Sequence, residues 1–177
     1  MKNFFLLAFI FSIFISCHRD YDKNADAETL PAITQSGART GGAIVNGKVW
    51  VASKNDVGTA NGMGTYCQQI KDKTYIRVDL RGINDQSRIW IKVEIDDLEL
   101  NKTYSIAPNN SINDNVITYS TTNDDVYFNV KNDCKLKITR LDLDQRIVSG
   151  TFELKLQKYP TDDTVDITEG RFDRRFD

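Results

Sequence analysis

The sequence predicts an all-β domain, a single antiparallel sandwich or barrel of about ten short strands. Apolar and polar residues alternate along much of the chain, most clearly from Lys135 to Phe176. This period of two is typical of strands with one buried face. Turn-forming residues recur between the alternating stretches. No segment carries apolar residues at helical spacing for three turns, so we expect no long helix.

The first residues have the pattern of a secretory signal peptide. Lys2 precedes an apolar run from Phe4 to Ile15, and the small residue Ser16 stands just before Cys17. The run is shorter than the ~20 apolar residues of a membrane-spanning helix. A cysteine at this point resembles a bacterial lipoprotein leader, in which that cysteine is lipidated and becomes the mature N-terminus. We therefore expect residues 1–16 to be removed.

This leader predicts where the protein is located and that it contacts a membrane. Cys17 is the expected lipid anchor, the membrane is the partner that it contacts, and the cell envelope, in the outer membrane, is the expected location. A plain secreted protein is the alternative. Residues 17–41 are rich in Asp, Asn, Ala, Thr and Gly and lack apolar periodicity, which predicts a flexible tether. The β domain is then expected at residues 42–177.

The strands can be placed in order from the alternation and the turns. Asn46-Gly47 favours a tight hairpin turn, and residues 65–70 and 74–81 form a second hairpin. Gly150 and Gly170 interrupt the last two strands, and a bulge at Gly170 would return Phe172 to the buried face. The remaining strands are expected near residues 88–95, 103–107, 115–119, 126–130, 135–142, 148–156 and 165–176.

Histidine and cysteine usage excludes several chemistries. The single histidine, His18, lies beside the expected anchor and outside the domain, which excludes nucleophiles that need an imidazole base and zinc sites that need histidine. We expect no catalytic residue, no metal and no cofactor. Cys67 and Cys134 are candidates for a disulfide because the envelope is oxidising. Two separate buried thiols are the alternative.

Charge gives one further exclusion and one weak candidate site. The net charge is −2 and the basic residues are spread along the strands, which leaves no electrostatic footprint for nucleic acid. Acidic side chains gather at Glu94, Asp96, Asp97 and Glu99. Such groups can hydrolyse glycosides or hold calcium. Their spacing matches no calcium loop, so a solvated turn is the favoured interpretation.

Several short motifs are similar to those of a known family. They are NGKVW at residues 46–50, SGTFEL at 149–154 and TEGRFD at 168–173, with LPAITQSG at 30–37 ahead of the first strand. From about Leu30 to the end, the chain resembles small envelope lipoproteins of Bacteroidetes whose domain has no known function. The resemblance implies an envelope-anchored β domain and supplies no catalytic residues.

The leading hypothesis is a non-enzymatic lipoprotein whose β domain binds a protein or a glycan, or has a structural role. Aromatic side chains are candidate contacts because they anchor partners at interfaces. For Trp90 the alternative is packing across neighbouring strands. A small-ligand carrier with a barrel cavity is a second hypothesis, and a carboxylate-dependent hydrolase is a third. The candidate contacts are Trp90, Tyr66, Tyr104, Tyr119 and Tyr127.

Overall fold

The computed structural model describes residues 29–54, 64–108 and 115–176, and these residues form eleven strands and no helix. The predicted all-β class is confirmed, with antiparallel pairing throughout. None of the described segments is a helix that could cross a membrane. The strands are β1 (Thr40–Val45), β2 (Lys48–Val51), β3 (Tyr66–Ile70), β4 (Lys73–Arg81), β5 (Arg88–Asp96), β6 (Thr103–Ile106), β7 (Val116–Ser120), β8 (Val126–Phe128), β9 (Cys134–Asp142), β10 (Ile147–Lys158) and β11 (Thr164–Arg175).

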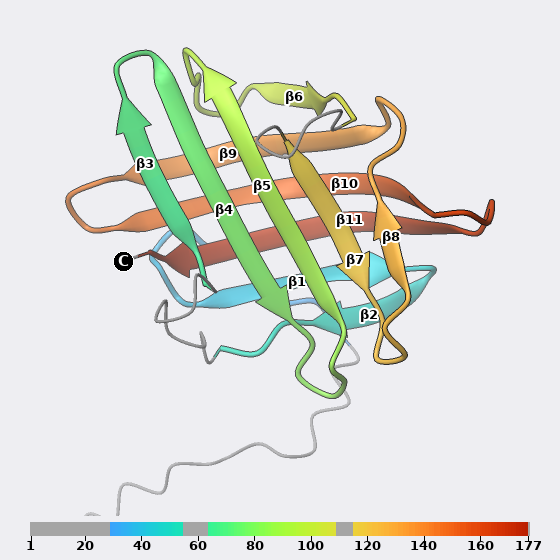
Figure 1. Cartoon of the computed structure of the whole chain (residues 1–177). Coiled ribbons are helices and arrows are strands. Elements are labelled where there is room, and N and C mark those ends of the chain that lie inside the picture. Colours follow the sequence, from blue (N-terminus) through green and yellow to red (C-terminus); the bar gives the residue numbers. More distant parts are fainter. Residues whose placement is uncertain (1–28, 55–63, 109–114, 177) are drawn as a thin grey trace, which may run out of the picture.

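The strands lie in two facing layers whose directions cross (Figure 1). The front layer has the order β3-β4-β5-β7-β8, and the back layer has the order β6-β9-β10-β11-β1-β2. Hydrogen bonds join the layers at two corners, where β8 pairs with the end of β10 and where Ala52 bridges Gly82. One sheet therefore folds over on itself without closing, which is consistent with a sandwich or an open barrel.

The alternating apolar residues of both layers meet in one filled core. Ile89, Ile91 and Val93 point inward from β5, and every second residue of β10, such as Leu154 and Leu156, points inward from the other layer. All five belong to a single cluster of buried side chains. Inward residues of both layers therefore pack against one another in one shared core.

Two glycines allow the strands of the back layer to approach closely. A Cβ atom on Gly150 would lie 2.4 Å from the carbonyl oxygen of Lys137, and one on Gly170 would lie 2.3 Å from the ring of Phe152. The pairing of β10 with β11 shifts beside Gly170, and Phe172 is buried against Phe152 with 6.3 Å between ring centroids. The bulge predicted at this glycine is confirmed.

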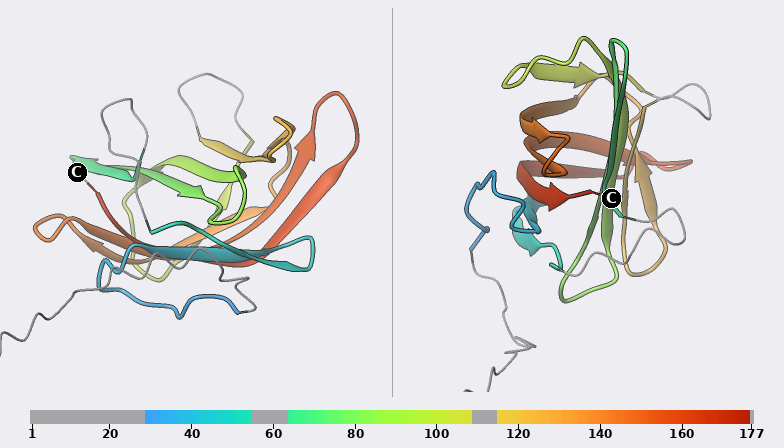
Figure 2. Two further views of the ribbon diagram at one scale, coloured as in Figure 1. Left: turned by 90° about the horizontal axis from the view of Figure 1, so that it is seen from below. Right: turned by 90° about the vertical axis from the view of Figure 1, so that its left-hand side faces the viewer.

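A segment ahead of β1, residues 30–38, runs across the outer face of the back layer (Figure 2). We call it the N-terminal strap. It is fixed by the buried carboxylate of Asp173 on β11. This carboxylate accepts hydrogen bonds from Thr34 Oγ1 (2.6 Å), Ser36 N (2.9 Å), Gly37 N (2.8 Å), Ala38 N (3.0 Å) and, within the layer, Ser149 Oγ (2.8 Å).

The strap shows that the folded part of the chain begins earlier than the sequence predicts. The sequence predicts a flexible tether up to residue 41 and a domain from residue 42, but β1 begins at Thr40 and the strap is held from Pro31 onwards, where Arg171 Nη1 donates to the Pro31 carbonyl (3.4 Å). The prediction of a flexible tether is wrong for residues 30–41. It was based on the lack of apolar periodicity, and this pattern does not detect a segment that is held by hydrogen bonds to its backbone. Cys17 and the first part of the tether lie outside the described residues.

Candidate functional site

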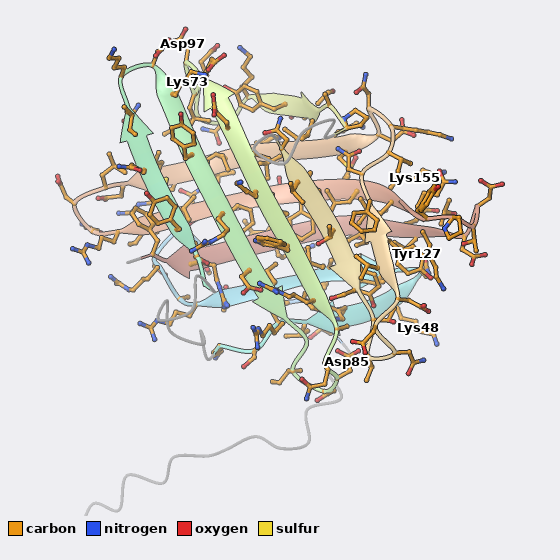
Figure 3. All side chains as sticks on the ribbon, viewed as in Figure 1. Lys48, Lys73, Asp85, Asp97, Tyr127 and Lys155 are labelled. Carbon is orange, nitrogen blue, oxygen red and sulfur yellow. The ribbon has the colours of Figure 1, made fainter. Side chains whose placement is uncertain are left out.

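The outer face of the front layer carries a groove of about 330 Å³ across β3, β4 and β5. We call it the aromatic groove, and its defining side chains are Tyr66, Tyr75, Arg77, Trp90, Lys92 and Glu94. Figure 3 looks onto this face, with Lys73 near one end of the layer and Asp85 at the other. A hollow lined by aromatic rings and a few polar groups is typical of a binding site.

The strand register places these side chains together. Tyr66 pairs with Arg77, and Arg77 pairs with Lys92, so the three form one row across adjacent strands. Tyr75 and Glu94 form the next row on one side, and Trp90 stands in the row on the other side. Inward residues between these positions, such as Ile76 and Ile91, belong to the core, which fixes the outward direction of the groove residues.

Tyr66 and Arg77 hold one another in place at the β3 side of the groove. The Arg77 guanidinium lies 5.5 Å from the centroid of the Tyr66 ring. At this distance the cation is attracted to the face of the ring. Arg77 Nε also donates to the Gly64 carbonyl (3.2 Å), and the Tyr66 hydroxyl donates to Gln68 Oε1 (2.5 Å). These contacts orient the tyrosine ring without burying it completely.

Trp90 lies at the other side of the groove and is oriented by Arg88. The Arg88 guanidinium lies 5.2 Å from the centroid of the Trp90 ring. Arg88 is held by two hydrogen bonds to the buried carboxylate of Asp79, at 2.6 Å and 2.8 Å. The Trp90 indole Nε1 is buried and has no acceptor among the described residues. The charge of Arg88 is thus matched within the protein, and the Trp90 ring is fixed in orientation.

The remaining charges give the groove an excess of positive charge. Lys73 contacts Glu94 and lies 3.4 Å from Asp96, and hydrogen bonds to these two carboxylates raise the pKa of Lys73. The negative charge of Glu94 is therefore balanced by Lys73. Arg77 and Lys92 form no ion pair within residues 29–54, 64–108 and 115–176. Both cations line the groove beside the aromatic rings.

The structure brings together two of the five predicted contact aromatics, Trp90 and Tyr66. Tyr104 stands on β6 in the back layer, with Lys102 Nζ 5.5 Å from its ring. Tyr119 is buried in the core, where burial raises its pKa, and its ring lies 6.1 Å from that of Tyr127, which packs partly against the same core. The prediction of a surface contact is wrong for Tyr119, because this residue alternates inward on β7.

Sequence reasoning missed Tyr75, although the signal was available. The alternation along β4 places Arg77 on the outer face. Tyr75 comes two residues earlier on the same strand, so its side chain points to the same face. Half-buried Tyr75 then lines the groove beside Tyr66 and Glu94.

Cys67 and Cys134 are separate buried thiols, so the predicted disulfide is wrong and the alternative holds. Cys67 is on β3 in the front layer, and Cys134 begins β9 in the back layer. Burial raises the pKa of Cys67 to about 12 and that of Cys134 to about 11. Both thiols act as small core residues, because each strand directs its cysteine into the packed interior.

The acidic run near residue 95 does not form one site. Glu94 and Asp96 contact Lys73, Asp97 occupies a turn at φ 46°, and Glu99 contacts Lys102. In the part of the chain that the structure describes, no three His, Cys, Asp or Glu side chains gather as metal ligands.

Among the described residues, two carboxyl groups have displaced pKa values, and both are displaced downward. Hydrogen bonds from the Gln145 amide and from Arg140 lower the pKa of Asp142. Burial raises the pKa of Asp173, but its five hydrogen bonds outweigh that effect and hold it at about 2. A general acid needs a raised pKa. Neither carboxyl group therefore suits the role that the hydrolase hypothesis requires.

Fold and site together define a small two-layer β module with a packed core and an aromatic, positively charged groove on one outer face. Residues 43–174 match the model of a family described as a domain of unknown function, DUF6252, and the chain belongs to this family. Comparisons with curated proteins and with solved structures give no match.

Proposed function

We propose that this chain is a lipid-anchored protein of the bacterial envelope, of the kind found in Bacteroidetes outer membranes, and that its β domain is a non-enzymatic binding module. Cys17 is the anchor, and the aromatic groove is the binding site for a protein or glycan. The observation that carries the proposal is the placement of Tyr66, Tyr75 and Trp90 on one outer face. Rigid aromatic side chains supply contact area at low entropic cost.

The position of the strap supports this arrangement. The strap lies on the outer face of the back layer (Figure 2), whereas the groove lies on the outer face of the front layer. The chain thus enters the domain on the side opposite the groove. An anchor at Cys17 would therefore join the domain through the layer opposite the groove.

Binding is tested through the fluorescence of Trp90. The protein has two tryptophans, and Trp50 is buried with its Nε1 donating to Ser87 Oγ (2.7 Å), so a ligand in the groove changes chiefly the emission of Trp90. We expect either the polysaccharide or the protein fraction of the envelope to change this emission in wild type. Tyr75→Ala should weaken the effect, whereas Tyr104→Ala, the matched change on β6, should not. No response to either fraction, or equal responses in both variants, would refute the groove as the site.

The anchor is tested by labelling cells with radioactive palmitate. We expect label in the wild-type protein and none in Cys17→Ser, which should instead appear in a soluble fraction. An unlabelled wild-type protein would refute the anchor and leave the groove to be judged by its own experiment.

A further inference from the structure

We infer that the ligand of the aromatic groove is an acidic polysaccharide, a chain of sugar rings that carry carboxylates. The inference rests on the proposed binding function and names the chemistry of the ligand. Two features of the groove carry it: the spacing of its rings and the two cations beside them, one of which is a lysine.

The rings are spaced for an extended ligand with flat, partly apolar units. Tyr66 and Trp90 stand two strands apart, and Tyr75 lies on the strand between them. Two strand spacings separate their backbones by roughly 10 Å across the sheet. A sugar ring has an apolar face of C–H groups that stacks on an aromatic side chain, and hydroxyl groups at its edge that bond to polar neighbours. The row of Trp90 continues through Thr118 to Phe128, which is 41% exposed, so the face extends beyond the groove itself.

The charges of the groove match a ligand that carries carboxylates. Arg77 and Lys92 are cross-strand neighbours, and neither forms an ion pair in the described part of the chain. Their excess positive charge stands on a chain whose net charge is −2. An arginine binds a carboxylate through two parallel hydrogen bonds, and complementary charge sets which ligand is selected.

The lysine of the groove favours a glycan over a protein partner. The buried centre of a protein interface is depleted of lysine, whereas aromatic residues and arginine are enriched there. Lys92 lines the groove on β5, beside Arg77. An acidic polysaccharide supplies carboxylates there and leaves water around the cations, so it pairs their charge without dehydrating them completely.

The first experiment measures affinity for polygalacturonate and for its fully methyl-esterified form, which has the same sugar chain without charge. The full-length protein in detergent should bind the acid form at least about tenfold more tightly, with affinity that falls as salt rises. Lys92→Gln should weaken binding about fivefold to tenfold, as expected for the loss of one charge-assisted contact. Lys48→Gln, the same change on an exposed lysine of β2, should leave the affinity unchanged.

A second pair of variants separates the ring of Trp90 from its N–H group. Trp90→Ala removes the stacking surface and should weaken binding about tenfold or more. Trp90→Phe keeps a ring and removes a buried donor that lacks an acceptor among the described residues, so it should retain most of the affinity and the stability of wild type. Circular dichroism of Trp90→Ala checks its fold, and Lys92→Gln gives an independent test if that fold is lost.

Alginate and hyaluronate extend the test to other sugar stereochemistries. Binding to none of the three acidic polysaccharides, or equal affinity for the acid and ester forms, would overturn the inference. So would polyglutamate binding as tightly as the polysaccharides, because the groove would then select an acidic peptide. If another ligand still changes the Trp90 emission in a Tyr75-dependent way, only the inference falls and the binding function stands. If no ligand does so, both fall.

Discussion

At the scale of single residues, Asp173 determines how the chain enters the fold. Its carboxylate belongs to a residue that is 1% exposed, and it accepts five hydrogen bonds, four of them from the strap. A buried charge is tolerated only when such donors surround it. Because these donors come from both the strap and β10, one side chain joins the beginning of the domain to its last strand.

Asp173→Asn should destabilise the domain by about 2–4 kcal/mol at pH 7, because an amide places N–H groups against donors and loses the charge-assisted bonds. The comparison is Asp166→Asn, the same change at an exposed position of β11. Urea unfolding followed by tryptophan fluorescence measures both. Equal stability of the two variants would contradict this account of the strap.

The same residue predicts a pH dependence. The pKa of Asp173 is about 2 in the folded protein and 3.8 without the fold, so the folded state favours the ionised form. This contribution, at most about 2 kcal/mol, is fully present well above the unfolded pKa and is lost as the pH falls through the folded one. Stability measured from pH 5 down to pH 2 should therefore fall more steeply in wild type than in Asp173→Asn, which cannot titrate there.

At the scale of elements, local patterns predicted the strands, and long-range contacts did not follow from them. Period-two alternation and the Asn46-Gly47 turn depend on near neighbours, so the hairpins and the bulge at Gly170 could be predicted. The pairing of β6 with β9 and the hydrogen bond from Thr34 to Asp173, 139 residues apart, join distant segments. No local pattern encodes such contacts.

The same distinction between local patterns and long-range contacts applies to the candidate site. Alternation placed Trp90 on an outer face and could have placed Tyr75 there as well. It could not show that Tyr66, Arg77 and Lys92 share one row, because this depends on the register between three strands. The disulfide prediction was wrong for a related reason: two cysteines in one compartment need not be neighbours in the fold.

Close contact between β9 and β10 makes Gly150 sensitive to any side chain. A Cβ atom there meets the Lys137 backbone oxygen at 2.4 Å and the Phe172 ring at 2.7 Å, and the backbone cannot move without disturbing the pairing. Gly150→Ala should cost about 3 kcal/mol or more. Gly47→Ala should cost only about 1 kcal/mol from backbone strain, because this turn residue has φ 79° and nothing within 4 Å. A smaller loss for Gly150→Ala than for Gly47→Ala would show that the strands can separate.

At the scale of the whole molecule, the two layers share one core and should unfold together. Ile91 in the front layer and Ile167 in the back layer are both fully buried and belong to the same cluster. Replacing either by alanine leaves a cavity in that shared core. Each substitution should therefore lower the free energy of unfolding by about 2–5 kcal/mol. The change Lys155→Ala, at an exposed position of β10, should alter it by less than about 0.5 kcal/mol.

The two tryptophans stand in different layers and can report on the unfolding of both. Trp50 stands on β2 in the back layer and Trp90 on β5 in the front layer, so Trp90→Phe and Trp50→Phe each leave one reporter. Because the layers are joined through the core and at two hydrogen-bonded corners, urea should shift both signals at the same midpoint, in the parent and in the Ile91→Ala and Ile167→Ala variants. Ile91→Ala could instead shift the Trp90 transition and leave that of Trp50 unchanged. The layers would then be independent units, and the stability of the groove would depend on the front layer alone.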